Sequence, residues 1–87
     1  MKVVAMPIDA IVIFKGEEHP IPYKFRYKDE DGDSRDVYVG RVIGVGERRL
    51  GNTDMLIYEC QSIIDEAEIR YQLKYFIPTC RWELYKI

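Results

Sequence analysis

The chain has 87 residues, of which 47% are hydrophobic and 32% are charged, and its formal net charge is -2. This length fits a single domain over residues 1–87, and this balance excludes an intrinsically disordered chain. Thirteen basic and fifteen acidic side chains provide no bulk attraction to nucleic acid or to an anionic membrane. No apolar run approaches the ~20 residues that cross a bilayer, so we expect no membrane partner.

The first predicted strand lies between Ile8 and Phe14. The residues before it faintly resemble a signal peptide, but Pro7 and Asp9 interrupt the apolar stretch and no small-x-small cleavage site follows. An almost continuously apolar run such as 8–14 is typical of a strand that is covered on both sides or buried in an interface. A turn or loop is expected over 15–20.

The second predicted strand alternates aromatic and cationic side chains, which is the period of a half-buried strand. Its members are Tyr23, Phe25 and Tyr27 against Lys24, Arg26 and Lys28. We expect the aromatic rings to face the core and the cations to face water. The acidic stretch 29–33 contains Asp31-Gly32, which predicts a hairpin turn. The third strand is predicted from Asp36 to Val45, with a bend at its glycines.

The second half of the chain predicts three more strands. Gly51-Asn52 marks a turn, and a strand follows from Met55 to Cys60. Ser62 and Asp65 fit a helical capping box, but alternation over 68–77 favours a strand there, with a loop or short turn across 63–67. Pro78-Thr79 ends this strand, and the last strand covers 81–87.

These six short strands predict an all-β domain. The expected architecture is a small six-stranded antiparallel barrel or strongly curled sheet, with at most one short helical turn near 62–67.

The acidic turn is the first candidate for a ligand site, because Asp29, Asp31 and Asp33 alternate as in a calcium loop. An EF-hand loop that starts at Asp29 would need glycine and glutamate where the chain has Ser34 and Gly40. The flanking segments also predict strands, so we interpret this stretch as a hairpin turn.

No other motif predicts a metal, a cofactor or catalysis. The stretch 44–49 begins like a dinucleotide fingerprint, but Arg49 stands at the third glycine position and no helix follows. A structural zinc site needs about four ligands with close pairs, whereas Cys60, Cys80 and His19 are isolated. We therefore expect no cofactor and a non-enzymatic protein.

The two cysteines are too few for the disulfide scaffold of a small secreted protein. We expect a cytoplasmic protein in which both thiols stay reduced and are buried or half-buried as small hydrophobic groups.

Two binding functions remain open. The chain has eleven aromatic residues and the apolar run 8–14, more than a small barrel interior accommodates, which favours an exposed apolar strand or sheet face that binds protein or forms a homodimer. The alternative is a single-stranded nucleic-acid-binding barrel that uses tyrosines and nearby cations. The candidate contacts for nucleic acid or a partner are Arg48, Arg49, Lys24, Arg26 and Lys28. A small-molecule binder or an enzyme ranks third.

A series of strand motifs extends from residue 20 to residue 87. It consists of Pro22-x-x-Phe25-Arg26-Tyr27, the acidic glycine turn, Val37-x-Val39-x-Arg41-Val42-Ile43, Tyr58-x-Cys60, Arg70-Tyr71-x-Leu73-x-Tyr75 and Trp82-x-Leu84-x-Lys86-Ile87. This series resembles small bacterial all-β domains of unknown function. The resemblance implies strands rather than a helix over 68–77, and it carries over no catalytic or ligand-binding residue.

Overall fold

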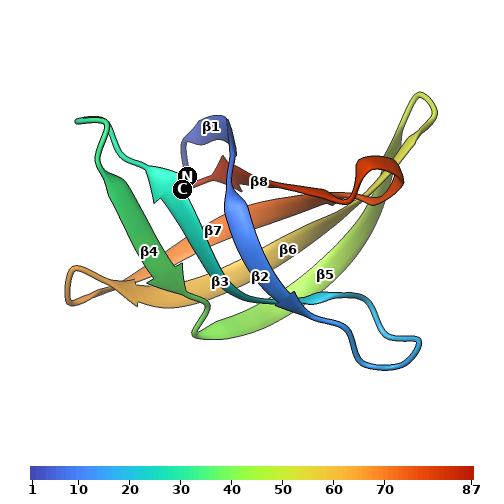
Figure 1. Ribbon diagram of the computed structural model, residues 1–87, viewed down its shortest axis with the longest axis horizontal. Helices are drawn as coiled ribbons and strands as arrows, with labels where there is room; N and C mark the ends of the chain where they lie inside the picture. The colour runs from blue at the N-terminus through green and yellow to red at the C-terminus, as the bar shows by residue number, and fades with distance from the viewer.

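Two antiparallel sheets make up the fold, and the computed structural model describes all residues from 1 to 87. Sheet order is β1-β8-β7-β6-β5 in the larger sheet and β2-β3-β4 in the smaller one. The two sheets curl around one core as a half-barrel, with β2, β3 and β4 crossing in front of the long strands (Figure 1). The bounds are β1 Val3–Pro7, β2 Asp9–Ile13, β3 Ile21–Lys28, β4 Ser34–Tyr38, β5 Arg41–Leu50, β6 Thr53–Ile64, β7 Ala67–Phe76, the 3-10 turn η1 Ile77–Thr79 and β8 Arg81–Lys86.

The chain passes between the sheets at two short corners. Ile8 alone separates β1 from β2, and its N–H donates to the carbonyl oxygen of Trp82 at 3.3 Å. Val39 and Gly40 separate β4 from β5, and the N–H of Gly40 donates to Oγ of Ser62 at 3.2 Å. A Cβ atom at Gly40 would lie 2.8 Å from the carbonyl oxygen of Gln61, so this close approach requires glycine.

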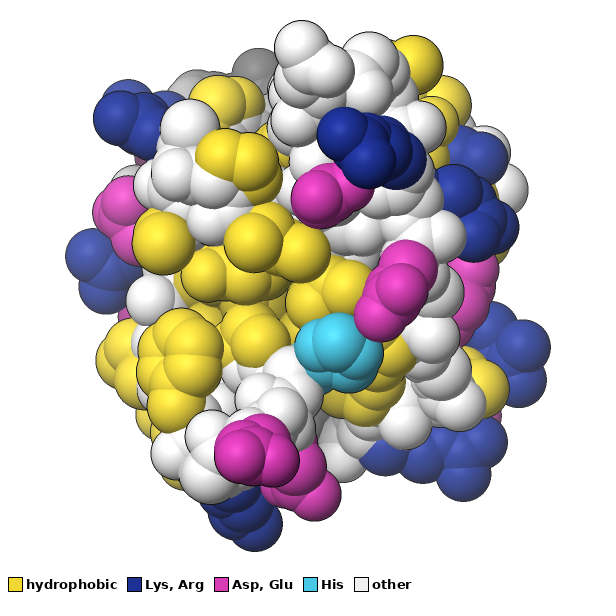
Figure 2. All heavy atoms as spheres, turned by 90° about the vertical axis from the view of Figure 1, so that its right-hand side faces the viewer, with side chains coloured by type: hydrophobic (Ala, Val, Ile, Leu, Met, Phe, Trp, Pro, Cys, Tyr) yellow, Lys and Arg dark blue, Asp and Glu magenta, His cyan; other side chains and the backbone are white.

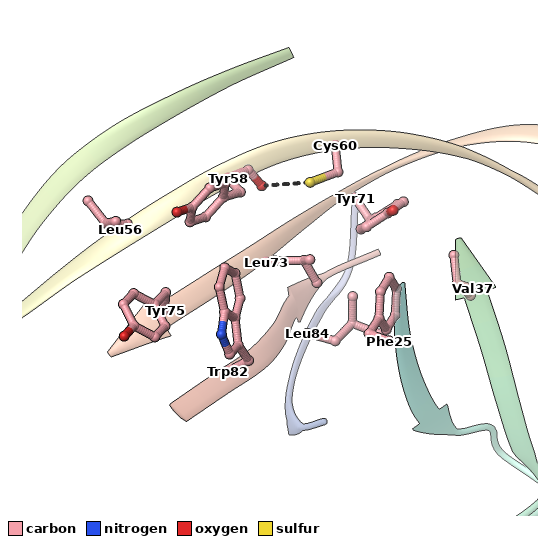
Figure 3. Packing of buried hydrophobic residues seen from close by; sticks show 10 residues of the cluster. All are labelled: Phe25, Val37, Leu56, Tyr58, Cys60, Tyr71, Leu73, Tyr75, Trp82 and Leu84. Carbon is pink, nitrogen blue, oxygen red and sulfur yellow. Dashed lines mark hydrogen bonds between the residues drawn. The ribbon is translucent and has the colours of Figure 1, made fainter. Parts of the chain in front are cut away.

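The core lies between the sheets and is rich in aromatic side chains. Its ten buried residues are Phe25 and Val37 from the small sheet and Leu56, Tyr58, Cys60, Tyr71, Leu73, Tyr75, Trp82 and Leu84 from the large sheet (Figure 3). In β6 and β7 these positions alternate with less buried ones, as the sequence pattern predicts. The all-β class and the strand over 68–77 are therefore confirmed.

Polar groups inside the core are paired. The hydroxyl of Tyr58 donates to the carbonyl oxygen of Pro20, which fixes the segment before β3, and the hydroxyls of Ser62 and Tyr71 lie 2.5 Å apart. The Sγ atom of Cys60 lies 3.8 Å from the carbonyl oxygen of Tyr58 (Figure 3). No buried side-chain nitrogen or oxygen lacks a hydrogen-bond partner. These bonds remove the penalty of burying polar atoms and fix one core arrangement.

The expected six strands and their bounds are partly wrong. The structure has eight strands, or seven when β1 and β2 are counted as one bent strand. The predicted strand 36–45 is two strands from different sheets, because the chain changes sheet at Gly40. The short turn expected across 63–67 is present as a tight, non-helical turn at Asp65 and Glu66, with φ of 50° and 67°. The single helical turn is η1, which contains Pro78.

Two side chains lie elsewhere than predicted. Tyr23 is 49% exposed rather than facing the core, because the register between β2 and β3 shifts between Ile11 and Val12. This bulge places Tyr23 against Tyr38, with ring centroids 5.7 Å apart. Cys60 is buried, as expected, but Cys80 is exposed at the end of η1. Both thiols are free.

None of the helical segments has the length and apolar character that crossing a membrane would require.

Candidate functional site

The β2 edge is the most distinctive surface of the fold. β2 has a hydrogen-bonded neighbour, β3, on one side only. Ala10 and Val12 pack against the core, whereas Ile11 and Ile13 are exposed by 58% and 42% on the outer side. An edge strand presents unpaired backbone N–H and C=O groups, so this one combines hydrogen-bonding capacity with apolar side chains on both faces.

The other three sheet edges are obstructed. β1 has a register shift, a positive φ of 44° at Ala5, and Pro7, which lacks an N–H. β4 carries two charged side chains, Arg35 and Asp36, and both Asp65 carboxylate oxygens in the β6–β7 turn accept from the guanidinium of Arg35 at 2.5 and 2.6 Å. β5 has a register shift and four charged side chains, Arg41, Glu47, Arg48 and Arg49. Natural sheets use such bulges, prolines and charges to prevent edge pairing.

β2 lacks these obstacles over most of its length. Its five residues read Asp-Ala-Ile-Val-Ile, with one charge at the first position and no proline or glycine. The register shift between β2 and β3 inserts its extra residue, Tyr23, in β3 and leaves β2 regular. The β2 edge is therefore open to another strand.

A cleft lies beside the β2 edge, where β2 diverges from β8. It encloses about 540 Å³, and Ala10, Phe76, Cys80 and Trp82 are among its lining residues. Viewed from the end where β2 and η1 terminate, hydrophobic side chains cover the centre of the face next to His19 (Figure 2). Phe14, directly after β2, is 65% exposed. The site thus combines an open backbone edge with an adjoining cleft, whose lining also includes the charged residues Asp9, Arg81 and Glu83.

The cations predicted on β3 are already neutralised in part. Nε and Nη2 of Arg26 donate to the two carboxylate oxygens of Asp36 at 2.7 and 3.2 Å, and Nζ of Lys24 lies 3.6 Å from the same carboxylate. The hydrogen bond from Arg26 lowers the pKa of Asp36. Lys24 also lies 5.0 Å from the ring centroid of Tyr38. Lys28, at the end of β3, is exposed and has no ion pair.

Arg48 and Arg49 do not form a joint cationic site. They oppose Met55 and Asp54 in the ladder with β6, so they point to opposite faces of β5. Nε of Arg49 lies 3.6 Å from Asp54, and Arg48 donates to the carbonyl oxygen of Glu47 at 2.9 Å. The five predicted cations therefore belong to two sheets, and only Lys24 and Arg26 share a partner.

The sequence analysis did not predict a second cationic surface, which lies on the large sheet. A depression of about 540 Å³ on the outer side of β5 to β8 is lined by Arg48, Lys74, Lys86 and Tyr85, with Gly44 and Gly46 among its remaining residues. Nζ of Lys74 lies 3.6 Å from the ring centroid of Tyr85. A register shift between β7 and β8 brings these residues together, and residue spacing alone does not reveal such a shift.

The acidic stretch 29–33 forms the hairpin turn between β3 and β4, as predicted. The carboxylate of Asp29 accepts from the N–H groups of Asp31 and Asp33, each at 3.0 Å. The carboxylates of these three residues lie within 4.8 Å of one another. Asp29 therefore organises the turn through its own backbone, as aspartates commonly do.

The buried thiol and the single histidine lack the features of a catalytic pair. Burial raises the pKa of Cys60 to about 12, which disfavours the nucleophilic thiolate at neutral pH. The side chain of His19 is 54% exposed, and its Nε2 lies 3.6 Å from the carboxylate of Glu47.

Comparisons with protein-family models, curated proteins and solved structures gave no match for this chain. The resemblance to small bacterial all-β domains therefore stays a prediction.

Proposed function

We propose that this protein is a non-enzymatic interaction module that binds an extended protein segment by strand addition at the β2 edge. The observation that carries this proposal is the contrast between β2 and the three obstructed edges. In strand addition, main-chain hydrogen bonds provide affinity and pockets for alternate side chains provide specificity. The cleft beside Ala10 supplies such a pocket.

The exposed surface also supports a binding role. The chain exposes 6036 Å², whereas a folded monomer of this mass exposes about 5,400 Å² on average. Only 14 of 87 residues are buried, and long apolar side chains of β2 and its continuation are among the exposed ones. Exposed apolar side chains that lie together on one surface are typical of proteins that bind other chains.

The cellular compartment of the protein is also part of this proposal. One of the two free thiols is exposed, and an exposed thiol persists more readily in a reducing environment. We therefore place the protein in the cytoplasm, as the cysteine content suggests.

Selection of peptides from a random displayed library tests strand addition without knowledge of the natural partner. The immobilised protein serves as bait at low density, and selected peptides are titrated into isotope-labelled protein and followed by amide NMR. We expect peptides with alternating apolar residues that shift the amides of 9–13 and bind the Ile11→Lys variant at least about tenfold more weakly. Ile63→Lys is the matched control, because Ile63 is 66% exposed on β6. Peptides that shift only other strands, or equal binding by both variants, would contradict the proposal.

Single-stranded nucleic acid on the outer face of the large sheet is the second candidate. The depression lined by Arg48, Lys74 and Lys86 around Tyr85 favours it, because base-stacking aromatics beside cations are typical of such sites. Two features weigh against it: Lys74 already covers the ring of Tyr85, and Glu59 lines the same depression.

Amide NMR titration with mixed short single-stranded DNA and RNA tests this second candidate. Nucleic-acid binding predicts shifts near Lys74 and Lys86 that weaken steeply between about 50 and 200 mM salt, because phosphate contacts release counterions. An absence of shifts at high oligonucleotide excess would exclude it.

A further inference from the structure

We infer that the strand added to β2 is β2 of a second copy of this chain, in an antiparallel pair centred on Val12. The inference rests on the proposed function, because it identifies the partner of the same edge. The paired segment is Asp9 to Lys15, which comprises β2 and the two exposed residues that follow it. The result is a continuous six-stranded sheet in which the two β2 strands are neighbours.

Symmetry restricts the ways in which β2 can pair with itself. In a two-fold antiparallel pair, directly opposed residues lie on the same face of the sheet. Adjacent residues of a strand point to opposite faces, so the axis must pass through a residue position rather than between two residues. Each possible centre fixes which side chains face one another, and the sequence can be tested against each of them.

Only the centre at Val12 gives complementary partners along the whole segment. Asp9 then faces Lys15 of the second copy, which pairs opposite charges. Ile11 faces Ile13 on the outer side, and the small Ala10 faces the large Phe14 on the inner side. A centre at Ile11 would set Asp9 against Ile13, and a centre at Ile13 would set Lys15 against Ile11. Both alternatives place a charge against an apolar side chain.

The structure leaves these groups available for the pairing. Asp9 and Lys15 are exposed and belong to none of the six ion pairs within the chain, and Arg26, which opposes Asp9 in the β2–β3 ladder, already donates to Asp36. Phe14 is 65% exposed and has no strand partner. In the dimer, Phe14 of the second copy lies opposite Ala10, which lines the cleft of about 540 Å³ between β2 and β8. The Phe14 ring of one copy, which is exposed to water in the monomer, therefore enters the cleft of the other copy.

The main chain contributes as well. Seven opposed pairs, alternately hydrogen-bonded, supply about six to eight backbone hydrogen bonds across the axis. The same contact covers Ile11 and Ile13 of both copies. The second copy thus removes the unpaired edge that distinguishes β2 from the other three edges of the sheets.

Charge exchange across the axis tests both the partner and its register. Sedimentation velocity from about 1 to about 300 µM should show the wild type converting to twice the 10.3 kDa mass of the chain. Asp9→Lys and Lys15→Asp each place like charges opposite one another twice per dimer, so each should raise the dimer dissociation constant about tenfold or more. The double variant Asp9→Lys with Lys15→Asp restores both attractive pairs and should restore dimerisation. Glu30→Lys, in the distant β3–β4 turn, is the control for charge alone.

The outcomes separate this inference from the proposed function. A wild type that stays monomeric throughout, a dimer unaffected by either single exchange, or a double variant that is not restored would each overturn pairing centred on Val12. The proposed function is judged by the peptide selection, which can still localise binding to β2 when the chain itself is monomeric. Because both exchanged residues are exposed, circular dichroism of each variant should match the wild type, so that a lost dimer is not a lost fold.

Discussion

Replacement of Trp82 by alanine tests the core most directly. Trp82 is 8% exposed, and its ring centroid lies 4.8 Å from that of Tyr75 and 5.1 Å from that of Tyr58. A large aromatic side chain buries about 150–250 Å², which corresponds to about 4–6 kcal/mol at 25 cal/mol per Å². Partial collapse of the cavity recovers some of this, so we expect Trp82→Ala to lower the free energy of unfolding by about 3–5 kcal/mol.

Urea denaturation followed by far-ultraviolet circular dichroism measures this change, because Trp82 is the only tryptophan and its fluorescence is lost in the variant. All proteins must be compared at one concentration, since self-association would add to the apparent stability. A domain of this size has a total stability of about 4–13 kcal/mol, so Trp82→Ala can leave the chain unfolded. Trp82→Phe, which retains a ring, should cost less and keeps the comparison measurable.

Leu50→Ala is the matched control, because Leu50 is hydrophobic but 76% exposed at the β5–β6 turn. Its loss should change the free energy of unfolding by no more than about 0.5 kcal/mol. A Trp82→Ala variant within about 1 kcal/mol of the wild type would refute the reasoning. It would mean that the ring does not fill the space between the sheets.

Three further predictions follow from the pKa shifts and from backbone geometry. Burial raises the pKa of Cys60 from 9.0 to about 12, so the stability that depends on its protonated thiol is fully present below pH 9 and declines as the pH rises toward 12. In denaturant titrations, the stability of a Cys60→Ala variant should decline less steeply over this pH range. Iodoacetamide at neutral pH should modify the exposed Cys80 before the buried Cys60. Gly40→Ala should lower the free energy of unfolding by about 1–3 kcal/mol, because the new Cβ atom would clash with the carbonyl oxygen of Gln61 on β6. Gly44→Ala is the control, because its Cβ atom would have no neighbour within 4 Å and should not cause this steric loss. Equal melting temperatures for the two variants would contradict the role of the corner. The hydrogen bond from Arg26 lowers the pKa of Asp36 from 3.8, so the contribution of this ion pair to stability is present above pH 3.8 and is lost as the pH falls through the lowered value. The difference in melting temperature between the wild type and Asp36→Asn should therefore vanish in strong acid. A difference that stays constant with pH would exclude the ion pair as its cause.

Alternation of side chains predicts the strands well where one face of the sheet packs on the core. Tyr71, Leu73 and Tyr75 follow this rule, and all three are buried. The rule fails at the corner near Gly40, because a change of sheet leaves the period of two nearly intact on both sides. The turn expected across 63–67 is present, but its two-residue form at Asp65 and Glu66 contains no glycine or asparagine that would signal it. There the turn is supported by an ion pair with Arg35, thirty positions away, which no local pattern contains.

The surfaces are harder to predict than the core, because they depend on register. The alternation over 23–28 correctly predicts that Arg26 and Lys28 are exposed, whereas Lys24 is half-buried. Asp36 on β4 neutralises Arg26 and Lys24 only because Arg26 and Asp36 are paired in the ladder. The cluster around Tyr85 requires a shift in the β7–β8 ladder that has no sequence signature. The sequence did indicate that 8–14 was too apolar for a solvent-exposed strand, and it left open whether a neighbour in the fold or another chain covers it.

The topology explains why no strand of the same chain completes the β2 edge. β8 has six residues, and β1 and Ile8 occupy its free side as far as Trp82. Beyond that point β8 has only Arg81, because the chain enters β8 directly from η1 and Cys80, whose φ is 54°. The start of β8 therefore lies beside the start of β2, and on the side of β2 away from β3 no strand of the chain pairs with the residues from Asp9 to Ile13. A strand that is apolar on both faces and regular along its edge can then satisfy its backbone groups without water only through another chain.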